Sequence, residues 1–381
     1  MKILLVGEYS RLHNSLKEGL TALGHEAIVV ATGDSFKNYD TNFSIAPKFI
    51  TGSWLTRTIK KVTYKLTRID LEKLEKAYRF YRLLPHFKGF DYVQLINSDA
   101  IETYPYLSIR LYKKLLYQNK KMSLLICGDE TPVIDQYLLD QLKYSVLTPY
   151  LKDNRLEKQF AYTLKYSYKP YRKVFEWVNS HAVALITSDL DYEVPMQKTG
   201  YTTKFIPNPI NSNAIAYKPL DIQNKIVIFL GINRLSYIKK GIVYFEEALK
   251  QIHKKYQDKV EIIVTENIPY ANYITLYDSA HIVLDQVYAY DQGYNALEAM
   301  AKGKVVFTGA ESEFNKHYNL LDEVAINALP NVDALANDLS YLIEHPDKII
   351  AMSQRARKFI EAEHNYITIA GEYLKAWGGE Q

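Results

Sequence analysis

Residues 1–31 read MKILLVGEYSRLHNSLKEGLTALGHEAIVVA, and the order of elements in this stretch decides the fold. An apolar run at Ile3–Val6 ends in Gly7, and leucines at helical spacing follow until Gly24. A second apolar run comes next, at Ala27–Ala31. The stretch therefore predicts a strand, a loop, a helix and a second strand.

Similar short apolar runs recur along the first half of the chain, at Tyr92–Ile96, Ser123–Cys127 and Ala182–Thr187. They are continuously apolar rather than alternating, which is typical of parallel strands covered on both faces. We therefore expect a doubly wound parallel sheet, the Rossmann-like form of the α/β class.

The same pattern restarts after the segment IPNPINS at 206–212, whose prolines and asparagines favour a linker. The second set of runs is Ile226–Leu230, Val260–Val264, His281–Leu284 and Val305–Phe307. The chain thus predicts two Rossmann-like domains in tandem. Ligands bind at the carboxyl ends of such strands, so two facing edges would form a cleft with one substrate on each wall.

We expect the N-terminal domain to cover 1–205 and the C-terminal domain to cover 206–365. The tail at 346–377 is predicted to be helical, because its apolar residues keep helical spacing. Its last part, 366–381, is expected to form a helix that returns to the N-terminal domain.

Composition narrows the classes of protein. The 381 residues carry a net charge of only +4, and the basic residues do not gather in a known nucleic-acid module. Cys127 is the only cysteine, so no internal disulfide can form and a reducing compartment is indicated. No apolar run suits a signal peptide or a transmembrane helix. We therefore expect a cytoplasmic protein that does not bind nucleic acid.

The most informative segment for function is YDQGYNALEAMAKGKVV at 290–306. Gly293 precedes a helical pattern that ends at Gly303, and a strand follows directly. Free N–H groups at such a helix N-terminus suit a phosphate, and Glu298, about one turn further on, can accept bonds from ribose hydroxyls. The alternative is an ordinary crossover helix with Glu298 in solvent.

A second segment, GINRLSYIKKG at 231–241, follows the strand predicted at Ile226–Leu230. Arg234 can grip a diphosphate with two parallel hydrogen bonds, and Lys240 adds a mobile point charge. The alternative is a basic loop in solvent. The sequence contains neither a Walker loop nor a GxGxxG motif.

These segments resemble glycosyltransferase family 4 of the GT-B fold. GINRLSYIKKG looks like the family's "GR…KG" donor-phosphate motif, and GYNALEAMAKGKVV at 293–306 looks like the second half of its E-x7-E motif. The helical region HPDKIIAMSQRARKFIEAEHNY at 345–366 and the linker IPNPIN are similar to further parts of the family pattern. The resemblance covers residues 180–377.

The resemblance implies a role for each matching position. Arg234 and Lys240 would neutralise the donor diphosphate, Glu298 would hold the ribose, and the nucleobase would bind at 265–269. The further donor-binding residues that it implies are Asn267, Ile268, Tyr290, Gly293, Tyr294 and Asn295. Members are retaining and metal-independent, so no metal and no cofactor is expected beside the nucleotide-diphosphate sugar. The two cations and a helix N-terminus would stabilise the leaving diphosphate.

The chain departs from the family pattern in two places. The first Glu of the E-x7-E motif would lie at position 290, where Tyr290 stands, with Asp291 beside it as a substitute. The histidine expected after a middle strand of the N-terminal domain is also missing. The nearest segment is DYVQLINSDA at 91–100, which has Gln94, Ile96 and Asn97 instead.

Loops that follow the N-terminal strands supply the candidate acceptor residues. The predicted acceptor-binding residues are Glu8, Arg11 and Asn97. The candidates for a catalytic acid or base are His13, Asp129, Glu130 and Asp291. The alternative for each residue is helix capping or solvation of the loop, and for His13 a positioning role.

A further segment, WLTRTIKKVTYKLTRI at 54–69, combines one apolar helical stripe with five basic residues. Such a helix can lie on an anionic bilayer surface. The alternative is that its stripe packs on the N-terminal sheet. The stretch at 162–177, rich in Tyr and Lys, leaves the same two interpretations open.

Taken together, the sequence predicts a hexosyltransferase that moves a sugar from a nucleotide-diphosphate donor to a glycan or lipid-linked acceptor. Its N-terminal domain would bind the acceptor and its C-terminal domain the donor, at the inner face of an anionic membrane, in bacterial surface-polysaccharide synthesis. The alternatives are a non-catalytic GT-B partner protein that binds a nucleotide or glycan, and a nucleotide-sugar epimerase.

Overall fold

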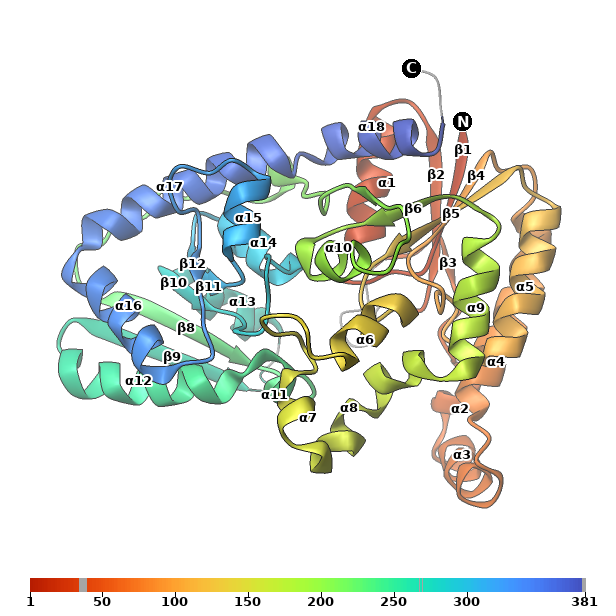
Figure 1. Ribbon diagram of the computed structural model, residues 1–381, viewed down its shortest axis with the longest axis horizontal. Coiled ribbons are helices and arrows are strands. Elements are labelled where there is room, and N and C mark those ends of the chain that lie inside the picture. Colours follow the sequence, from red (N-terminus) through yellow and green to blue (C-terminus); the bar gives the residue numbers. More distant parts are fainter. Residues whose placement is uncertain (34–39, 267, 269, 379–381) are drawn as a thin grey trace.

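The structure of the protein, a computed structural model, describes residues 1–33, 40–266, 268 and 270–378 (Figure 1). It contains two separate parallel sheets, one from each half of the chain, with helices packed around them. The prediction of two Rossmann-like domains in tandem is confirmed.

The N-terminal sheet has seven strands in the order β3-β2-β1-β4-β5-β6-β7. Its strands are β1 (Lys2–Val6), β2 (Glu26–Ala31), β3 (Phe43–Ser44), β4 (Tyr92–Leu95), β5 (Lys121–Ile126), β6 (Ala182–Thr187) and β7 (Lys204–Phe205). Strand β1 pairs Ile3 with Ala27 of β2 on one side and with Tyr92 of β4 on the other. Strand β4 is buried along its whole length, which explains the absence of polar alternation in its sequence.

Ten α-helices and three short 3-10 helices surround this sheet in the described part of the N-terminal half. They are α1 (Leu12–Ala22), α2 (Phe49–Gly52), α3 (Trp54–Thr67), α4 (Leu71–Leu83), η2 (Leu84–His86), α5 (Pro105–Tyr117), α6 (Thr131–Leu138), α7 (Thr148–Lys152), η3 (Asn154–Leu156), α8 (Glu157–Leu164), η4 (Lys165–Ser167), α9 (Lys169–Asn179) and α10 (Leu190–Met196). The stretch at 162–177 lies in α8, η4 and α9, where Leu164, Val174 and Phe175 are buried. This stretch is therefore part of the domain core.

The C-terminal sheet has five strands in the order β12-β11-β10-β8-β9. Its strands are β8 (Ile226–Ile232), β9 (Val260–Glu266), β10 (Ile282–Leu284), β11 (Val305–Thr308) and β12 (Ile326–Asn327). The helices of this half are η5 (Ser212–Ala214), α11 (Tyr237–Lys240), α12 (Ile242–Tyr256), α13 (Tyr270–Ser279), α14 (Tyr294–Ala301), α15 (Ser312–His317), α16 (Val332–Glu344), α17 (Pro346–Glu363) and α18 (Tyr366–Ala376).

The helical tail is divided into α17 and α18 by a break at His364 and Asn365. Asn365 caps α18, because its side chain accepts hydrogen bonds from the N–H groups of Ile367 and Thr368. Helix α18 lies against α1 of the N-terminal domain (Figure 1). The chain thus crosses between the domains twice, once at 206–212 and once at this break.

The approach of α18 to α1 is unusually close at Gly19. A Cβ atom added there would lie 2.1 Å from the carbonyl oxygen of Tyr366 and 2.8 Å from the Cβ of Ala370. At the far end of α18, Trp377 donates a hydrogen bond to Oε1 of Gln94 at 2.9 Å. The last helix is thereby part of the N-terminal domain's core.

Candidate functional site

The loop between β1 and α1 has a strained backbone. Gly7, Ser10 and Arg11 all have positive φ angles, of 87°, 52° and 74°. Only glycine adopts this conformation without cost, so Ser10 and Arg11 are held there by their surroundings. A Cβ atom on Gly7 would also lie 2.3 Å from Cγ2 of Ile96. The loop thus presents its side chains in one enforced arrangement.

The three predicted residues of this loop are placed by different contacts. The buried Glu8 accepts hydrogen bonds from the backbone and side-chain nitrogens of Asn14, at 2.9 and 2.8 Å. Arg11 pairs with Glu18 at 2.7 Å. His13 is fully buried, and its Nδ1 lies 2.7 Å from the carbonyl oxygen of Gly7. Burial lowers the pKa of His13 to about 4, so its ring is neutral at physiological pH and holds the loop in place.

The first turn of α14, in the other domain, meets the first turn of α1 directly after this loop. The hydroxyl of Tyr294 lies 2.5 Å from Oγ of Ser15 and donates to the carbonyl oxygen of Pro209 at 2.7 Å. Burial raises the pKa of this hydroxyl, Glu298 and Glu8 raise it further, and Arg11 lowers it. Glu8, Arg11 and Glu298, which come from the two domains, are therefore all close enough to act on Tyr294.

The basic segment after β8 carries two differently held cations. Arg234 is exposed and forms a two-pronged ion pair with Glu266 at the end of β9, at 2.8 and 2.6 Å. Lys240, the last residue of α11, instead donates to Oδ1 of Asp285 at 2.7 Å. Both cations follow the carboxyl end of β8, as the sequence predicted from their position after the strand.

Asp285 is the residue around which this edge of the C-terminal sheet is organised. It follows β10 directly, is buried, and also accepts hydrogen bonds from Asn295 at 3.1 Å and from Thr308 at 3.3 Å. A buried carboxylate with three donors holds the ammonium group of Lys240 beside Asn295, in the first turn of α14. Gly293 caps that helix without a side-chain bond.

The residues at the departure from the family pattern face the N-terminal domain. The hydroxyl of Tyr290 accepts a hydrogen bond from the backbone N–H of Lys143 at 2.9 Å. The backbone N–H of Tyr290 donates to Oδ1 of Asp191 at 2.8 Å. Asp291 accepts from the N–H of Leu190 at 3.3 Å. Tyr290 and Asp291 therefore join the two domains in this conformation.

Three buried carboxylates lie close together at this junction: Asp189, Asp191 and Asp291. Burial, together with the charge of Asp291, raises the pKa of Asp191 to about 7. Burial likewise raises the pKa of Asp291 to about 7. Carboxylates that share such a site cannot all ionise easily, so this junction holds protons near neutral pH.

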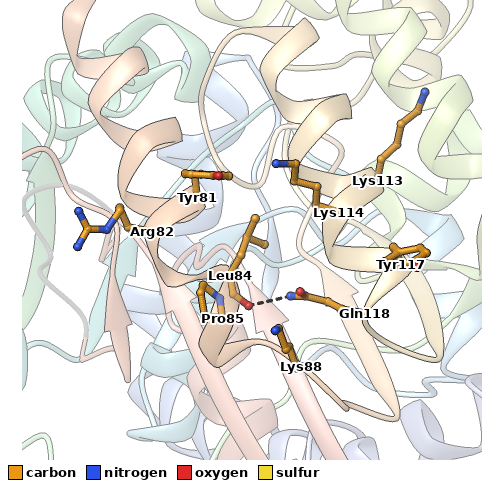
Figure 2. A pocket seen from close by; sticks show the side chains of 9 residues that line it. All are labelled: Tyr81, Arg82, Leu84, Pro85, Lys88, Lys113, Lys114, Tyr117 and Gln118. Atoms are coloured by element: carbon orange, nitrogen blue, oxygen red, sulfur yellow. Dashed lines mark hydrogen bonds between the residues drawn. The ribbon is translucent and has the colours of Figure 1, made fainter.

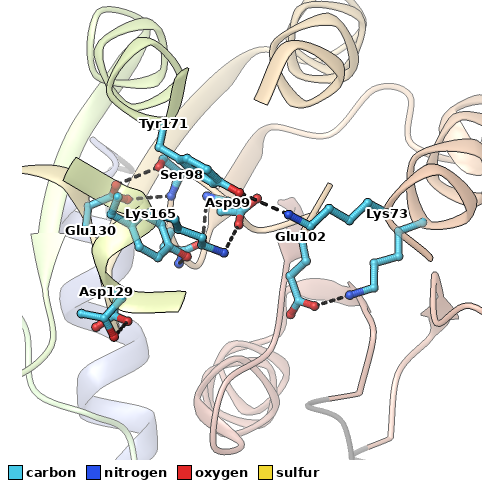
Figure 3. A network of polar contacts seen from close by, with 12 residues as sticks. Lys73, Ser98, Asp99, Glu102, Asp129, Glu130, Lys165 and Tyr171 are labelled. Carbon is cyan, nitrogen blue, oxygen red and sulfur yellow. Dashed lines mark hydrogen bonds and ion pairs between the residues drawn. The ribbon is translucent and has the colours of Figure 1, made fainter. Parts of the chain in front are cut away.

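The candidate residues of the middle N-terminal strands form the network in Figure 3. Glu130 is buried and accepts hydrogen bonds from the N–H and hydroxyl of Ser98, at 2.7 and 2.8 Å, and from the N–H of Thr131 at 2.9 Å. Its pKa is raised to about 7 by burial, against the effect of these bonds. Glu130 thus links the loops after β4 and β5. Asn97 stabilises its own loop by accepting from the N–H of Asp99 at 2.9 Å.

Beside Glu130, Figure 3 shows a lysine enclosed by rings and a carboxylate. Lys165 pairs with the buried Asp99 at 2.9 Å. Its ammonium lies 3.7 Å from the ring centre of Tyr162 and 5.1 Å from that of Tyr171. Lys73 donates a hydrogen bond to the hydroxyl of Tyr171 at 3.4 Å. The pKa of Lys73 is lowered by its burial and by the charge of the neighbouring Lys165. This edge of the N-terminal sheet is therefore rich in tyrosine and lysine.

Asp129 takes part in a contact chain across the domains. It accepts a hydrogen bond from the hydroxyl of Thr163 at 2.5 Å, and that hydroxyl accepts one from Lys239 of α11 at 2.6 Å. Lys240 thus faces its own domain, whereas its neighbour Lys239 contacts the other. The sequence alone did not predict that Lys239 and Lys240 contact different domains.

A groove between the ends of α4 and α5 lies away from these residues (Figure 2). It is lined by tyrosines and lysines, among them Tyr81 and Lys114, whose ammonium is 4.6 Å from the tyrosine ring centre. Gln118 closes one end by donating to the carbonyl oxygen of Leu84 at 2.8 Å. The groove is at the amino ends of β4 and β5, opposite the edge that carries the candidate site.

Of the two predicted nucleobase contacts, Asn267 lies outside the described residues, and Ile268 is half-buried after β9. No group of three or more His, Cys, Asp or Glu side chains within the described residues is arranged to hold a metal ion. Nor does any described helix have the length and apolarity needed to span a bilayer.

Sequence reasoning did not single out Asp285, Glu266 or Asp191. Asp285 carried a usable signal, because it is a carboxylate directly after a predicted strand at the ligand-binding edge. Glu266 lies inside a segment chosen for its place beside the nucleobase. Asp191 carried no such signal, because its contact with Tyr290 depends on how the domains meet.

Comparison with known proteins identifies a matching segment and a matching fold. Residues 241–375 match the family model described as "Glycosyl transferase-like". No curated protein matches the chain.

Solved structures similar over nearly the whole length include sucrose-phosphate synthase from Thermosynechococcus elongatus. That match has a TM-score of 0.62 and 16% identity, and covers 99% of this chain and 98% of that chain. HepE from Anabaena, in complex with UDP and glucose, matches with a TM-score of 0.57 and 12% identity, over 99% of both chains. UDP-GlcNAc 2-epimerase from Neisseria meningitidis, bound to UDP-GlcNAc, matches with a TM-score of 0.53 and 13% identity, also over 99% of both.

At these identities the similarity concerns the fold, which both the transferases and the epimerase share with this chain. The chain therefore has the GT-B fold, and it carries a glycosyl transferase-like segment over residues 241–375.

Proposed function

We propose that the protein is a glycosyltransferase that moves a hexose from a nucleotide-diphosphate donor to a glycan or lipid-linked acceptor. The observation that carries the proposal is the meeting of the start of α1, directly after the β1–α1 loop, with the start of α14. There the hydroxyl of Tyr294 lies 2.5 Å from Oγ of Ser15 of the N-terminal domain, with the charges of Glu8 and Arg11 on one side of the junction and that of Glu298 on the other. Both elements follow the carboxyl ends of parallel strands, where ligands of such sheets bind.

On the donor side, Lys240 and Arg234 would bind the diphosphate, and Glu298 the ribose. The salt bridge of Lys240 to Asp285 orients its ammonium beforehand, so that little reorganisation is needed as charge develops on the leaving group. Arg234 is exposed, and its exchange of Glu266 for a phosphate would cost little. Uridine is the nucleoside we favour, because HepE was solved with UDP-glucose and the epimerase with UDP-GlcNAc.

We further propose a retaining transfer without metal or other cofactor, in the synthesis of a bacterial surface polysaccharide, by a cytoplasmic protein at the inner face of the membrane. Glu8, Arg11 and Asn97 would bind the acceptor. The cations at the donor site supply the charge stabilisation that a metal ion gives in other transferases.

Thermal unfolding with a panel of nucleotide diphosphates and nucleotide sugars, measured with and without Mg²⁺, tests the donor site. A ligand that binds only the folded state raises the midpoint. We expect a rise with UDP and UDP-sugars that does not depend on Mg²⁺ and is lost in Arg234→Ala/Lys240→Ala. Lys250→Ala, on the exposed face of α12, is the control and should keep the rise. No rise with any nucleotide would contradict the donor site.

An epimerase is the second candidate, because UDP-GlcNAc 2-epimerase has the same fold over 99% of both chains. The two reactions differ in their need for an acceptor. Incubation of the protein with UDP-GlcNAc alone, followed by NMR, should leave the donor sugar unchanged if the protein is a transferase. A new UDP-sugar, or release of free sugar, in the absence of any acceptor would favour the epimerase. Nucleotide binding without either reaction would favour a non-catalytic partner protein.

A further inference from the structure

The segment formed by α2 and α3, residues 49–69, projects from the N-terminal domain (Figure 1). Apart from each other, α2 and α3 pack mainly on α4. None of the residues of α3 is buried. This helix of 14 residues therefore contributes no side chain to the core of the domain.

The apolar stripe of α3 faces away from the protein. Leu55, Ile59 and Val62 are 54%, 49% and 51% exposed, and Leu66 is 77% exposed. The only half-buried positions of α3 are Thr56, Lys60 and Thr63, which are polar. This orientation is the reverse of a core helix, and it rules out packing of the stripe on the N-terminal sheet.

Two large aromatic residues extend the exposed apolar surface. Trp54 at the start of α3 is 77% exposed, and Phe49 at the start of α2 is 70% exposed. Tryptophan is enriched where a protein meets the boundary between lipid tails and water. Exposure of so many large apolar side chains on one projecting segment is characteristic of an interaction site.

The charge of α3 is entirely positive. Its sequence has no acidic residue, and Arg57, Lys61 and Lys65 are exposed, with Arg68 directly after the helix. At 100° per residue Arg57 and Lys61 lie across the helix axis from the apolar stripe, and Lys65 lies at about a right angle to it. Lys60 is neutralised within the protein by Glu72 at 2.5 Å. The described residues provide no such ion pair for Lys61 or Lys65.

We propose that the α2–α3 segment is the surface by which this protein docks on an anionic lipid bilayer. The stripe of Leu55, Ile59, Val62 and Leu66 enters the boundary of the acyl chains, and the cations bind lipid phosphates. A second copy of the chain is the poorer occupant, because two such segments would bring only like charges together. This inference refines the membrane location proposed above and does not depend on sugar transfer.

The position of the segment also suits a lipid-linked acceptor. Helix α4 follows α3 directly, and its first turns contact the loop after β4. The hydroxyl of Tyr104 accepts from the N–H of Asp70 at 2.6 Å, and Thr103 donates to the carbonyl oxygen of Lys73 at 2.6 Å. Docking through α2–α3 would thus bring the acceptor-side edge of the sheet toward the lipid surface.

Co-sedimentation of the full chain with vesicles tests the proposal. We expect binding to vesicles of equimolar phosphatidylcholine and phosphatidylglycerol, weak binding to phosphatidylcholine alone, and loss of binding at high salt. Leu55→Asp/Leu66→Asp should weaken binding to the anionic vesicles about tenfold or more. The matched control is Leu321→Asp, at a leucine that is 100% exposed on the other domain, which should bind like the wild type.

Lys61→Glu/Lys65→Glu should weaken binding to anionic vesicles while leaving the unfolding midpoint unchanged, since both side chains are exposed. The proposal is wrong if the wild type ignores anionic vesicles, or if both α3 variants bind as well as Leu321→Asp. A dimer in solution that Leu55→Asp/Leu66→Asp dissolves would also overturn it, in favour of a second copy on this surface. Nucleotide binding, measured in the same variants, should be unaffected in every case, so failure here is separate from failure of the transferase proposal.

Discussion

At the scale of single residues, the proposed donor site depends on one buried carboxylate. Asp285 holds Lys240 at 2.7 Å and Asn295 at 3.1 Å, so it positions both residues without any need to touch a ligand itself. A side chain that acts in this way can be identified by its effect on the affinity for a nucleotide.

Asp285→Asn should therefore lower the affinity for UDP by about tenfold, because Lys240 loses a charged partner that orients it. Isothermal titration with UDP measures the change. Asp278→Asn is a suitable control, since it also removes an ion pair with a lysine, Lys302 at 2.5 Å, but at the amino end of the sheet. Equal affinity in Asp285→Asn and the wild type would show that Lys240 needs no such partner.

A second residue makes stability depend on pH. His364 is buried at the break between α17 and α18, with Nδ1 2.8 Å from the carbonyl oxygen of Asn208, and burial lowers its pKa to about 4. An unfolded histidine has a pKa near 6.5, so below that pH the unfolded state binds the extra proton. The contribution of His364 to stability is thus fully present above about pH 6.5 and is lost as the pH falls toward 4.

Acidification from pH 7 to pH 5 should cost about 2 kcal/mol of unfolding free energy through His364. His364→Asn keeps a donor near the Nδ1 position but cannot titrate, so this part of the acid sensitivity should disappear. Urea unfolding at several pH values measures it, with His345→Asn, at an exposed histidine, as the comparison. The same pH dependence in His364→Asn as in the wild type would contradict the assignment.

At the scale of elements, the contact of α1 with α18 is the one that depends most on a small side chain. Gly19 lets the carbonyl oxygen of Tyr366 approach to a distance that no Cβ allows. Gly371, in α18 itself, has open space around its Cβ position. The two helical glycines therefore differ in whether a methyl group can be added.

Gly19→Ala should destabilise the protein by about 1–3 kcal/mol, because α18 must move away from α1. Gly371→Ala should stabilise it by about 0.5–1 kcal/mol, since alanine favours the helix and nothing is displaced. Chemical unfolding of both variants measures the difference in sign. If both substitutions destabilise the protein, or if neither does, then the close approach of α18 to α1 at Gly19 does not determine the effect of an added methyl group.

At the scale of the whole molecule, the two domains form one packed body. A single core cluster includes Ile3 of the N-terminal sheet, Phe229 of the C-terminal sheet and Trp377 after α18. Polar contacts cross the junction as well, among them those of Lys143 with Glu311 at 2.9 Å and with Glu313 at 2.7 Å. The candidate site between the domains is therefore preformed in this conformation.

The buried carboxylates at the junction should make this packing sensitive to pH in the direction opposite to that of His364. Asp291 has a pKa of about 7, against about 4 in an unfolded chain, so the folded state holds its proton between these values. Its contribution to stability is present below about pH 4 and is lost as the pH rises through 7.

As the pH rises from 5 to 8, the unfolding free energy of the wild type should thus fall by about 2 kcal/mol relative to that of Asp291→Asn, whose side chain cannot ionise. Unfolding free energies of both proteins across this range check the prediction. Asp347→Asn is the control, at an exposed carboxylate in the first turn of α17. A constant difference between the wild type and Asp291→Asn would show that this group does not titrate between the two pH values.

Much of the fold could be predicted because strand signals in this chain are local. Runs such as Ile3–Val6 and Val305–Phe307 are apolar throughout, and the structure has β1 and β11 there. The strands β3, β7 and β12 were not predicted, since each has only two residues and pairs at a sheet edge. A pair of residues is too short to show a period.

The candidate site could be predicted only as a set of loops. Parallel sheets bind ligands at the carboxyl ends of their strands, so Glu8, Arg234 and Lys240 could be named from their positions after strands. Which side chains meet could not be derived, because the partners of Lys240 and Tyr294 lie 45 and 279 residues away in the chain.

By itself, the sequence determined the two parallel α/β domains, the linker and the order of the motifs, because these follow from apolar periodicity and from turn residues close together in the chain. Only the tertiary structure decided which way α3 turns its apolar stripe, that Asp285 holds Lys240, and that Tyr290 and Asp291 join the domains. These outcomes depend on contacts between distant segments, which form when the surfaces of packed elements meet and leave no local pattern behind.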